Sequence, residues 1–287
     1  MTTSPLFHNK TDSVEIQKKH YTSSERFADS ELERLLDLAT FAAISGGSIL
    51  QELYGKPHDI HKKGAVNLVT EADLAAETAI LSLLKEQTPD FQIMSEEKST
   101  SHTLCQSETI WIVDPLDGTT NFAHGFPFFA VSIGLLQHGQ PQVGVVYAPL
   151  LNELYTAKAG AGAFLNVIPI QTSTACHLVE SLVATGFPYE RKGVLDGITQ
   201  RLHRVLEKVQ DVRRAGSAAL DLAMVACGHL DAYYEQQLNP WDSAAGWLLV
   251  LEAGGQVTDF SGAPYSPFTP HILATNGLIH DEMRALL

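Results

Sequence analysis

The chain has 287 residues, of which 45% are hydrophobic and 18% charged, and its formal net charge is −14. This length allows one large domain or two lobes, and the acidic balance argues against binding nucleic acid or anionic membranes through a basic surface. Three scattered cysteines form no disulfide or zinc pattern, and no stretch is long and apolar enough to span a membrane. Because the N-terminus also lacks a signal-peptide pattern, a cytoplasmic location is expected.

The first third of the chain predicts a polar extension over residues 1–29 and two helices. Ser30 and Glu33 have capping-box spacing ahead of an apolar periodic stretch, which predicts a helix from about residue 30 to 54, with a disturbance at Gly46 and Gly47. Residues 68–69 form a short extended piece, and a second helix is expected over 71–87. Asp73 lies in its first turn, where an acid is either favoured by the helix dipole alone or functional.

Acidic residues follow the next two predicted strands. Residues 91–95 predict a strand that ends at Glu96, which either is simply solvated or serves a site. After a polar loop over 98–108, residues 110–113 predict a buried strand that ends in Asp114 and Asp117. Pro115 fixes its own φ and biases Asp114 towards an extended conformation, so both carboxylates leave the strand in a defined geometry. A solvated turn is the simpler alternative for such a run.

Gly118 follows these acids and allows the backbone to approach a ligand closely. The amides of residues 118–120 can then face an anion, as at a helix N-terminus. Carboxylates bind hard cations, and cations together with amides bind phosphate. The pattern over residues 111–122 therefore favours a metal and phosphate site.

A run of strands is expected over 128–137, 142–148, 153–158 and 163–167, and their breaks predict a largely antiparallel meander. Gly160 and Gly162 are expected in a hairpin turn. A further strand over 182–185, a helix over 194–209 and an apolar helix from about 218 to 227 follow. Arg213 and Arg214 are either a surface pair or an attraction for an anionic substrate.

The last informative stretch places Glu235 at the end of a short strand and Asp242 at the cap of a helix over 243–252. Capping alone would explain Asp242. Metal binding is compatible with capping, since one carboxylate can do both. The mixed order of strands and helices by itself predicts only an α/β or α+β fold.

Four motifs in this order resemble the inositol monophosphatase family, a group of magnesium-dependent, lithium-sensitive sugar-phosphate phosphatases. Along the chain they are the Leu-Val-Thr segment ending at Asp73, the Glu-Glu pair at 96–97, the Asp-Pro-Leu-Asp-Gly-Thr-Thr-Asn-Phe run at 114–122, and Trp-Asp-x-Ala-Ala-Gly at 241–246. The resemblance runs from about residue 30 to the C-terminus. It implies an αβαβα sandwich, with an N-terminal lobe over 30–180, a C-terminal lobe over 181–287 and assembly as a homodimer.

The resemblance also implies the residues of the site. Two to three Mg²⁺ ions would be held by five residues: Glu96, Asp114, the backbone carbonyl of Leu116, Asp117 and Asp242. The expected catalytic residues are Thr119, Asp73 and Glu96, and a water activated by the metal would attack phosphorus. In the family the residue matching Asp73 either orients the threonine or binds a third metal. Asn67 stands where the family usually has Asp, and either Lys62 or Lys63 matches the family lysine.

Substrate contacts are implied for Asp117, Gly118, Thr119, Ala218 and Glu235. Thr120 stands where relatives acting on 3′-phosphoadenosine 5′-phosphate commonly carry Lys, so myo-inositol 1-phosphate or a similar polyol or sugar monophosphate is the expected substrate. A related phosphatase acting on fructose 1,6-bisphosphate, histidinol phosphate or NADP is the alternative. The remaining alternative is a binding or regulatory protein that retains an inherited fold.

Overall fold

The computed structural model describes residues 27–56, 60–62, 68–97, 109–190 and 192–287. Almost all of the expected extension, together with Lys63 and Asn67, lies outside these ranges. Lys62 ends β1 (Ile60–Lys62), which pairs antiparallel with β2 (Leu68–Thr70). Among the described residues, no helix combines the length and apolar character needed to cross a bilayer.

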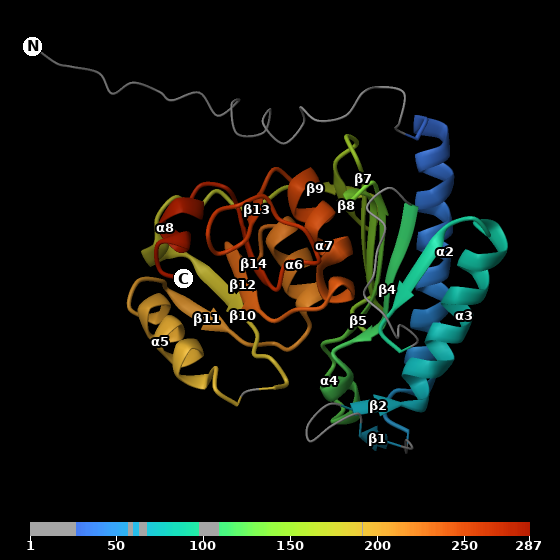
Figure 1. Ribbon diagram of the computed structural model, residues 1–287, viewed down its shortest axis with the longest axis horizontal. Coiled ribbons are helices and arrows are strands. Elements are labelled where there is room, and N and C mark those ends of the chain that lie inside the picture. The colour runs from blue at the N-terminus through green and yellow to red at the C-terminus, as the bar shows by residue number, and fades with distance from the viewer. Residues whose placement is uncertain (1–26, 57–59, 63–67, 98–108, 191) are drawn as a thin grey trace, which may run out of the picture.

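Helices and sheets alternate in five layers, which confirms the αβαβα sandwich (Figure 1). Helices α2 (Asp29–Leu53) and α3 (Glu71–Gln87) cover one face of a seven-stranded sheet. Helices α6 (Ala218–Ala226) and α7 (Pro240–Glu252) fill the layer between this sheet and a five-stranded one. Helices α5 (Leu195–Leu206) and α8 (His280–Arg284) cover the outer face of the second sheet.

The seven-stranded sheet is antiparallel except where β3 runs parallel to β4, which confirms the expected meander. The expected strand over 163–167 is wrong at its end, because Asn166 and Val167 form a two-residue turn with positive φ and a further short strand follows. In order across the sheet, the strands are β3 (Gln92–Ser95), β4 (Thr109–Asp117), β5 (Ala130–Gln137), β6 (Gln140–Ala148), β7 (Glu153–Lys158), β8 (Ala163–Leu165) and β9 (Ile168–Ile170).

The five-stranded sheet is mixed. Strand β10 runs parallel to both of its neighbours, whereas β14 is antiparallel to the strands beside it. In order, the strands are β11 (Asp211–Arg213), β10 (Leu182–Thr185), β12 (Ala232–Gln236), β14 (His271–Thr275) and β13 (Gln256–Thr258). The two large sheets thus use residues 92–170 and 182–275, and the division into lobes at residue 180 stays a prediction.

Three helix details differ from expectation. Ser30 lies inside α2, which begins at Asp29 without a side-chain cap, so the capping-box prediction was wrong there. The helix also continues through Gly46 and Gly47, so the predicted disturbance there was wrong. These glycines instead allow close packing, since a Cβ on Gly47 would lie 2.5 Å from the Tyr147 ring. Helix α7 starts at Pro240, two residues before Asp242, so Asp242 lies in the first turn and is not the cap.

Two glycines of the seven-stranded sheet allow α7 to approach it closely. Gly134 on β5 and Gly144 on β6 are paired directly opposite each other. A Cβ on Gly144 would lie 2.6 Å from the carbonyl oxygen of Ala245, and one on Gly134 would lie 2.9 Å from the Ala244 Cβ. Such contacts exclude larger residues at both positions, and this close packing positions the helix that carries Asp242.

Candidate functional site

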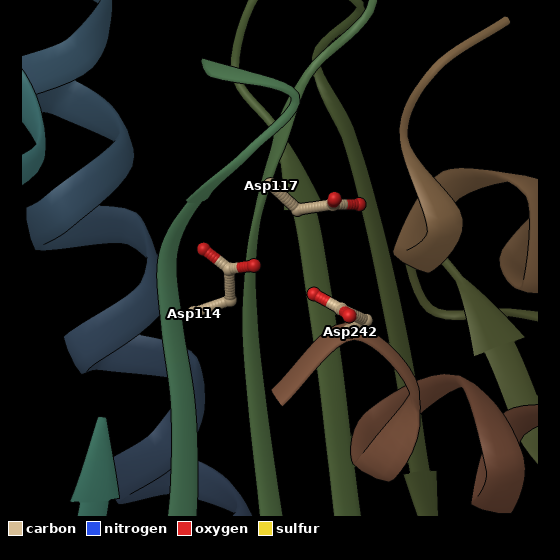
Figure 2. A group of neighbouring side chains, drawn as sticks. All are labelled: Asp114, Asp117 and Asp242. Atoms are coloured by element: carbon tan, nitrogen blue, oxygen red, sulfur yellow. The ribbon is translucent and has the colours of Figure 1, made fainter. Parts of the chain in front are cut away.

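Three carboxylates from two elements converge at the end of β4. Asp114 and Asp117 lie on this strand, whose pairing with β5 shifts register between them, and Asp242 comes from the first turn of α7. One oxygen atom from each lies within 4.8 Å of the others, and Figure 2 shows the three side chains directed at one another. The structure therefore brings together acids that are separated by more than a hundred positions in the sequence.

Hydrogen bonds orient each of these acids through one of its oxygens. Oδ1 of Asp114 accepts from the Leu116 amide at 3.0 Å, and Oδ2 of Asp242 accepts from the Asn239 amide at 2.6 Å. Oδ2 of Asp117 accepts from the Ala219 amide at 2.7 Å and from the Ser217 hydroxyl at 2.5 Å. Because these bonds fix the orientation of the carboxylates, the arrangement suits ligands held ready for a cation.

Glu96 lies outside this tight group but lines the same cavity, whose volume is about 230 Å³. It follows β3 directly, and the parallel pairing of β3 with β4 places it beside the end of the strand that carries Asp114. Leu116, Gly118 and Thr119 also line the cavity. The metal ligands implied by the sequence therefore all border one space.

The acids repel one another strongly. Burial raises the pKa of Asp114 well above its ordinary value, and the charges of Glu96, Asp117 and Asp242 raise it further. Burial also raises the pKa of Asp117 to about 6, although donors from Ser217, Ala219 and Ala218 oppose the shift. The pKa of Asp242 is raised by burial and then by Asp117 and Glu96. A divalent cation would relieve this repulsion, and an all-oxygen donor set suits a hard one.

Thr119 and Asp73 meet beside the acid cluster. The Thr119 hydroxyl is 3.0 Å from Oδ1 of Asp73 and 3.1 Å from the Leu116 carbonyl oxygen. Oδ2 of Asp73 accepts from both the amide and the hydroxyl of Thr70, at 2.8 and 2.6 Å, within the capping box of α3. Both residues are buried, and Asp73 contacts the Thr119 hydroxyl while it also closes the capping box of α3.

Gly118 makes the turn after Asp117. Its φ is +97°, and a Cβ there would lie 3.0 Å from the Phe128 carbonyl oxygen. The backbone thus adopts a conformation that favours glycine, and it turns directly into the short helix α4 (Thr119–Ala123). The backbone at Gly118 therefore borders the acid cavity without a side chain that would fill it.

The predicted polyol contacts Ala218 and Glu235 do not line the cavity that holds the acids, and Glu235 lines a separate, small pocket instead. Ala218 opens α6, and its amide lowers the pKa of Asp117. Glu235 lies on β12, and a Cβ on Gly186 would collide with its carboxylate, so a larger residue at position 186 would require the Glu235 side chain to move. The Tyr233 hydroxyl donates to Oε2 of Glu235 at 2.5 Å. Burial raises the pKa of Glu235 to about 7.

Sequence reasoning missed several residues of the site. Tyr189, Asn239 and Trp241 line the cavity, and Ser217 holds Asp117. The capping position of Ser217 at the start of α6 was a usable signal, because its side chain also accepts from the Leu220 amide. Tyr189 carries no such signal, since it lies on an irregular segment after β10 whose course depends on tertiary packing.

The layered fold and this site define a class of protein: a phosphomonoesterase whose acidic centre could hold a metal ion. Comparison with known proteins agrees, since residues 31–287 match the inositol monophosphatase family. The chain belongs to this family and is a phosphoric monoester hydrolase of the inositol-1-monophosphatase type.

Three relatives illustrate the similarity. The chain is 47% identical to an inositol-1-monophosphatase of Synechocystis sp., with 93% of each chain covered. It is 41% identical to Nus factor SuhB of Escherichia coli, with 88% of this chain and 94% of the relative covered. The solved structure of an inositol monophosphatase from Anabaena superposes with a TM-score of 0.80 at 42% identity, covering 89% of this chain and 96% of that one.

Proposed function

We propose that the chain hydrolyses myo-inositol 1-phosphate, or a similar polyol or sugar monophosphate, to the alcohol and inorganic phosphate with the help of Mg²⁺. The observation that carries this proposal is the convergence of Asp114, Asp117 and Asp242, with one oxygen from each within 4.8 Å of the others. Buried carboxylates at this separation are unfavourable by themselves and become favourable around a divalent cation.

Two to three Mg²⁺ ions fit this donor set. Glu96, Asp114 and the Leu116 carbonyl would hold one ion, and Asp114, Asp117 and Asp242 a second. Glu96 would hold a third, weaker ion. Mg²⁺ in this position supplies charge for the phosphoryl group and lowers the pKa of water. The oriented oxygens of the three aspartates support this assignment.

The protein's own groups then position the phosphate and move a proton. The amides of Gly118 and Thr119 lie beside the cavity and would donate to phosphate oxygens. The Thr119 hydroxyl, held by Asp73 at 3.0 Å, would take the proton from the attacking water and pass it towards the carboxylate, with Glu96 assisting. Positioning and charge neutralisation account for most of the rate in such transfer.

Polyol recognition would come from Glu235 and Ala218. Glu235 lies beyond the acid cluster on β12, and its charge raises the pKa of Asp242. A carboxylate there accepts hydrogen bonds from hydroxyl groups, whereas a second phosphate would be repelled by it. This favours polyol monophosphates over fructose 1,6-bisphosphate and NADP, which carry further phosphates, and the substrate panel below separates them from histidinol phosphate.

Phosphate release from a panel of these substrates, with and without Mg²⁺, tests the proposal. The highest kcat/KM is expected for myo-inositol 1-phosphate, with no turnover after chelation. A higher kcat/KM for the bisphosphate, histidinol phosphate or NADP would assign the enzyme to that substrate. Turnover that persists without any divalent ion would refute the metal assignment.

A binding role is the second candidate, because a relative at 41% identity is named a Nus factor. The same chain could combine both activities, and the panel above separates them. Protein with bound Mg²⁺ that releases no phosphate from any substrate would favour the binding role. Assembly as a homodimer, inhibition by lithium and a cytoplasmic location remain part of the proposal, and sedimentation, lithium titration and cell fractionation test them.

A further inference from the structure

Glu77 is a buried acid of α3 that the proposed mechanism does not use. Its side chain has no exposed surface, and its Oε1 atom accepts a hydrogen bond from the Ser95 hydroxyl at 2.6 Å. Ser95 is 2% exposed and ends β3. The next residue along the chain is Glu96, which lines the cavity of the acid cluster. The hydrogen bond therefore joins α3 to the segment that carries a proposed metal ligand.

The backbone of Glu96 is attached on two sides. Its amide donates to the Val113 carbonyl at 3.2 Å, which continues the parallel pairing of Ser95 with Val113 on β4. Successive side chains of a strand point to opposite faces, so Ser95 can contact α3 while Glu96 lines the cavity. The β4 backbone and the Glu77 side chain thus both limit where Glu96 can lie.

Helix α3 carries a second acid on the same face. Asp73 precedes Glu77 by four residues, which places both on one side of the helix, and neither has any exposed surface. Asp73 accepts from the Thr119 hydroxyl at 3.0 Å, as Glu77 accepts from Ser95. One face of α3 therefore holds two segments of the site, one with the proposed proton-transfer group and one with Glu96.

Stabilisation of the fold is a weaker explanation for Glu77. The buried residues of α3 beyond it are apolar, and they are Ile80, Leu81 and Leu84. Burying a carboxylate among such residues is unfavourable, and replacing both partners of a buried hydrogen bond by apolar groups can be nearly neutral. The helix start is already closed by the capping box of Thr70 and Asp73. Folding alone therefore gives little reason for an acid at position 77.

We infer that Glu77 is a positioning residue that acts through Ser95 to hold Glu96 in place for Mg²⁺. The inference rests on the proposed function and adds to it a residue outside the ligand set. Loss of a group that orients a metal ligand typically lowers metal affinity or activity by about 10- to 100-fold. Because Glu77 touches neither substrate nor the proposed ions, its loss should weaken metal binding more than it slows the reaction at saturating metal.

Variants of both hydrogen-bonding partners test this inference. Ser95→Ala removes the donor, and Glu77→Met removes the acceptor at similar volume. Each should raise the Mg²⁺ concentration for half-maximal hydrolysis of myo-inositol 1-phosphate about 10-fold, with kcat at saturating Mg²⁺ within about 3-fold of wild type. Glu77→Gln keeps an acceptor for the Ser95 hydroxyl, so its Mg²⁺ requirement should rise less than that of Glu77→Met.

A binding measurement separates metal affinity from activity. Mn²⁺ prefers the same oxygen ligands as Mg²⁺, and electron paramagnetic resonance measures its binding without substrate. Ser95→Ala and Glu77→Met should each weaken Mn²⁺ binding about 10-fold, and the double variant should be no weaker than either, since both changes break one bond. Ser82→Ala and Glu86→Gln are matched controls at exposed positions of α3 and should change neither measurement.

The outcomes are distinct. Variants that melt at lower temperature but keep wild-type Mg²⁺ and Mn²⁺ affinities would overturn the inference and leave Glu77 a role in folding alone. Additive losses in the double variant would also contradict it. If Glu77→Met does not fold, Ser95→Ala and Glu77→Gln still decide. Wild-type protein that binds Mn²⁺ but releases no phosphate would refute the proposed function, while the Mn²⁺ affinities of the variants would still decide the role of Glu77.

Discussion

The hydroxyl of Thr119 donates to Oδ1 of Asp73 over 3.0 Å, and this bond joins the start of α4 to the start of α3. The other oxygen of Asp73 accepts from Thr70, which closes the capping box of α3. The start of α3 therefore fixes Asp73, the residue that positions the Thr119 hydroxyl for the proton transfer in the proposed mechanism.

Replacing Thr119 tests the role of its hydroxyl. Thr119→Val keeps the shape of the side chain but removes the hydroxyl, so kcat should fall about 10²-fold or more with a smaller change in KM. Thr119→Ser restores a hydroxyl and should recover most of the rate. Steady-state kinetics of both variants provide the measurement, and equal activity in Val and Ser variants would contradict the assignment.

Asp114→Asn should separate catalysis from stability. Loss of this charge removes a ligand common to two proposed ions, so kcat/KM should fall by about 10³-fold or more. The same change relieves repulsion with Glu96, Asp117 and Asp242, so the metal-free variant should melt at a higher temperature than the metal-free wild type. Asp90→Asn, at an exposed turn, is the control. Wild-type rates in the Asp114 variant would exclude it as a ligand.

Metal removal should reveal the pH dependence of the acid cluster. The pKa of Asp117 in the folded protein, about 6, lies above its ordinary value of 3.8, so the folded state binds this proton more tightly. In metal-free protein the associated stability is present at low pH and is lost as pH rises through about 6. Mg²⁺ binds the ionised form, so the rise in melting temperature on adding Mg²⁺ should be larger at pH 8 than at pH 5. Equal rises at both values would contradict this coupling.

His280 should give a pH dependence of the opposite sign. Its ring is buried between the hydroxyls of Thr258 and Thr275, and burial lowers its pKa from 6.5 to about 4. The unfolded chain takes up the proton first, so the stability that His280 contributes is complete above pH 6.5 and is lost as pH falls towards 4. The loss amounts to about 3 kcal/mol.

Denaturant unfolding between pH 7 and 4 measures this effect as the difference between wild type and His280→Asn. The variant should lose less stability over this range, because it lacks the titrating ring. If the unfolding free energies of the two proteins changed in parallel with pH, the His280 ring would have the same pKa in the folded and unfolded states.

Gly144→Ala tests whether the close packing of α7 on the seven-stranded sheet positions Asp242. The added methyl group would lie 2.6 Å from the Ala245 carbonyl, so the helix must move, and the protein should lose about 1–3 kcal/mol of stability. The movement would also displace Asp242 and raise the Mg²⁺ concentration needed for half-maximal activity. Gly197→Ala in α5 meets nothing within 4 Å and should be neutral or stabilising. A normal Mg²⁺ requirement in the Gly144 variant would show that the helix position is not limiting.

Much of the fold followed from local patterns in the sequence. Alternating apolar stretches with turn residues predicted the meander, and the Thr70 and Asp73 spacing predicted the start of α3. Errors came where a local signal was ambiguous. Ser30 has capping spacing, but the helix begins one residue earlier, and Asp242 resembled a cap although Asn239 takes that position.

The site was harder to predict than the fold, because it depends on contacts between distant elements. The motif residues Asp114, Asp117 and Asp242 could be proposed from the family resemblance, but their convergence depends on how α7 packs on the sheet. Tyr189 gave no signal, since an irregular segment is common in proteins of any function.

Asp73 and Asp242 each close a capping box, at the starts of α3 and α7. Folding alone therefore gives a reason to retain these two acids, even in a descendant that no longer turns over substrate. An acid that closes no capping box has no such structural reason to be retained, and Asp114 is the clearest example. A relative that has become purely a binding protein should reveal itself first at that position, while its helix starts still resemble those of an enzyme.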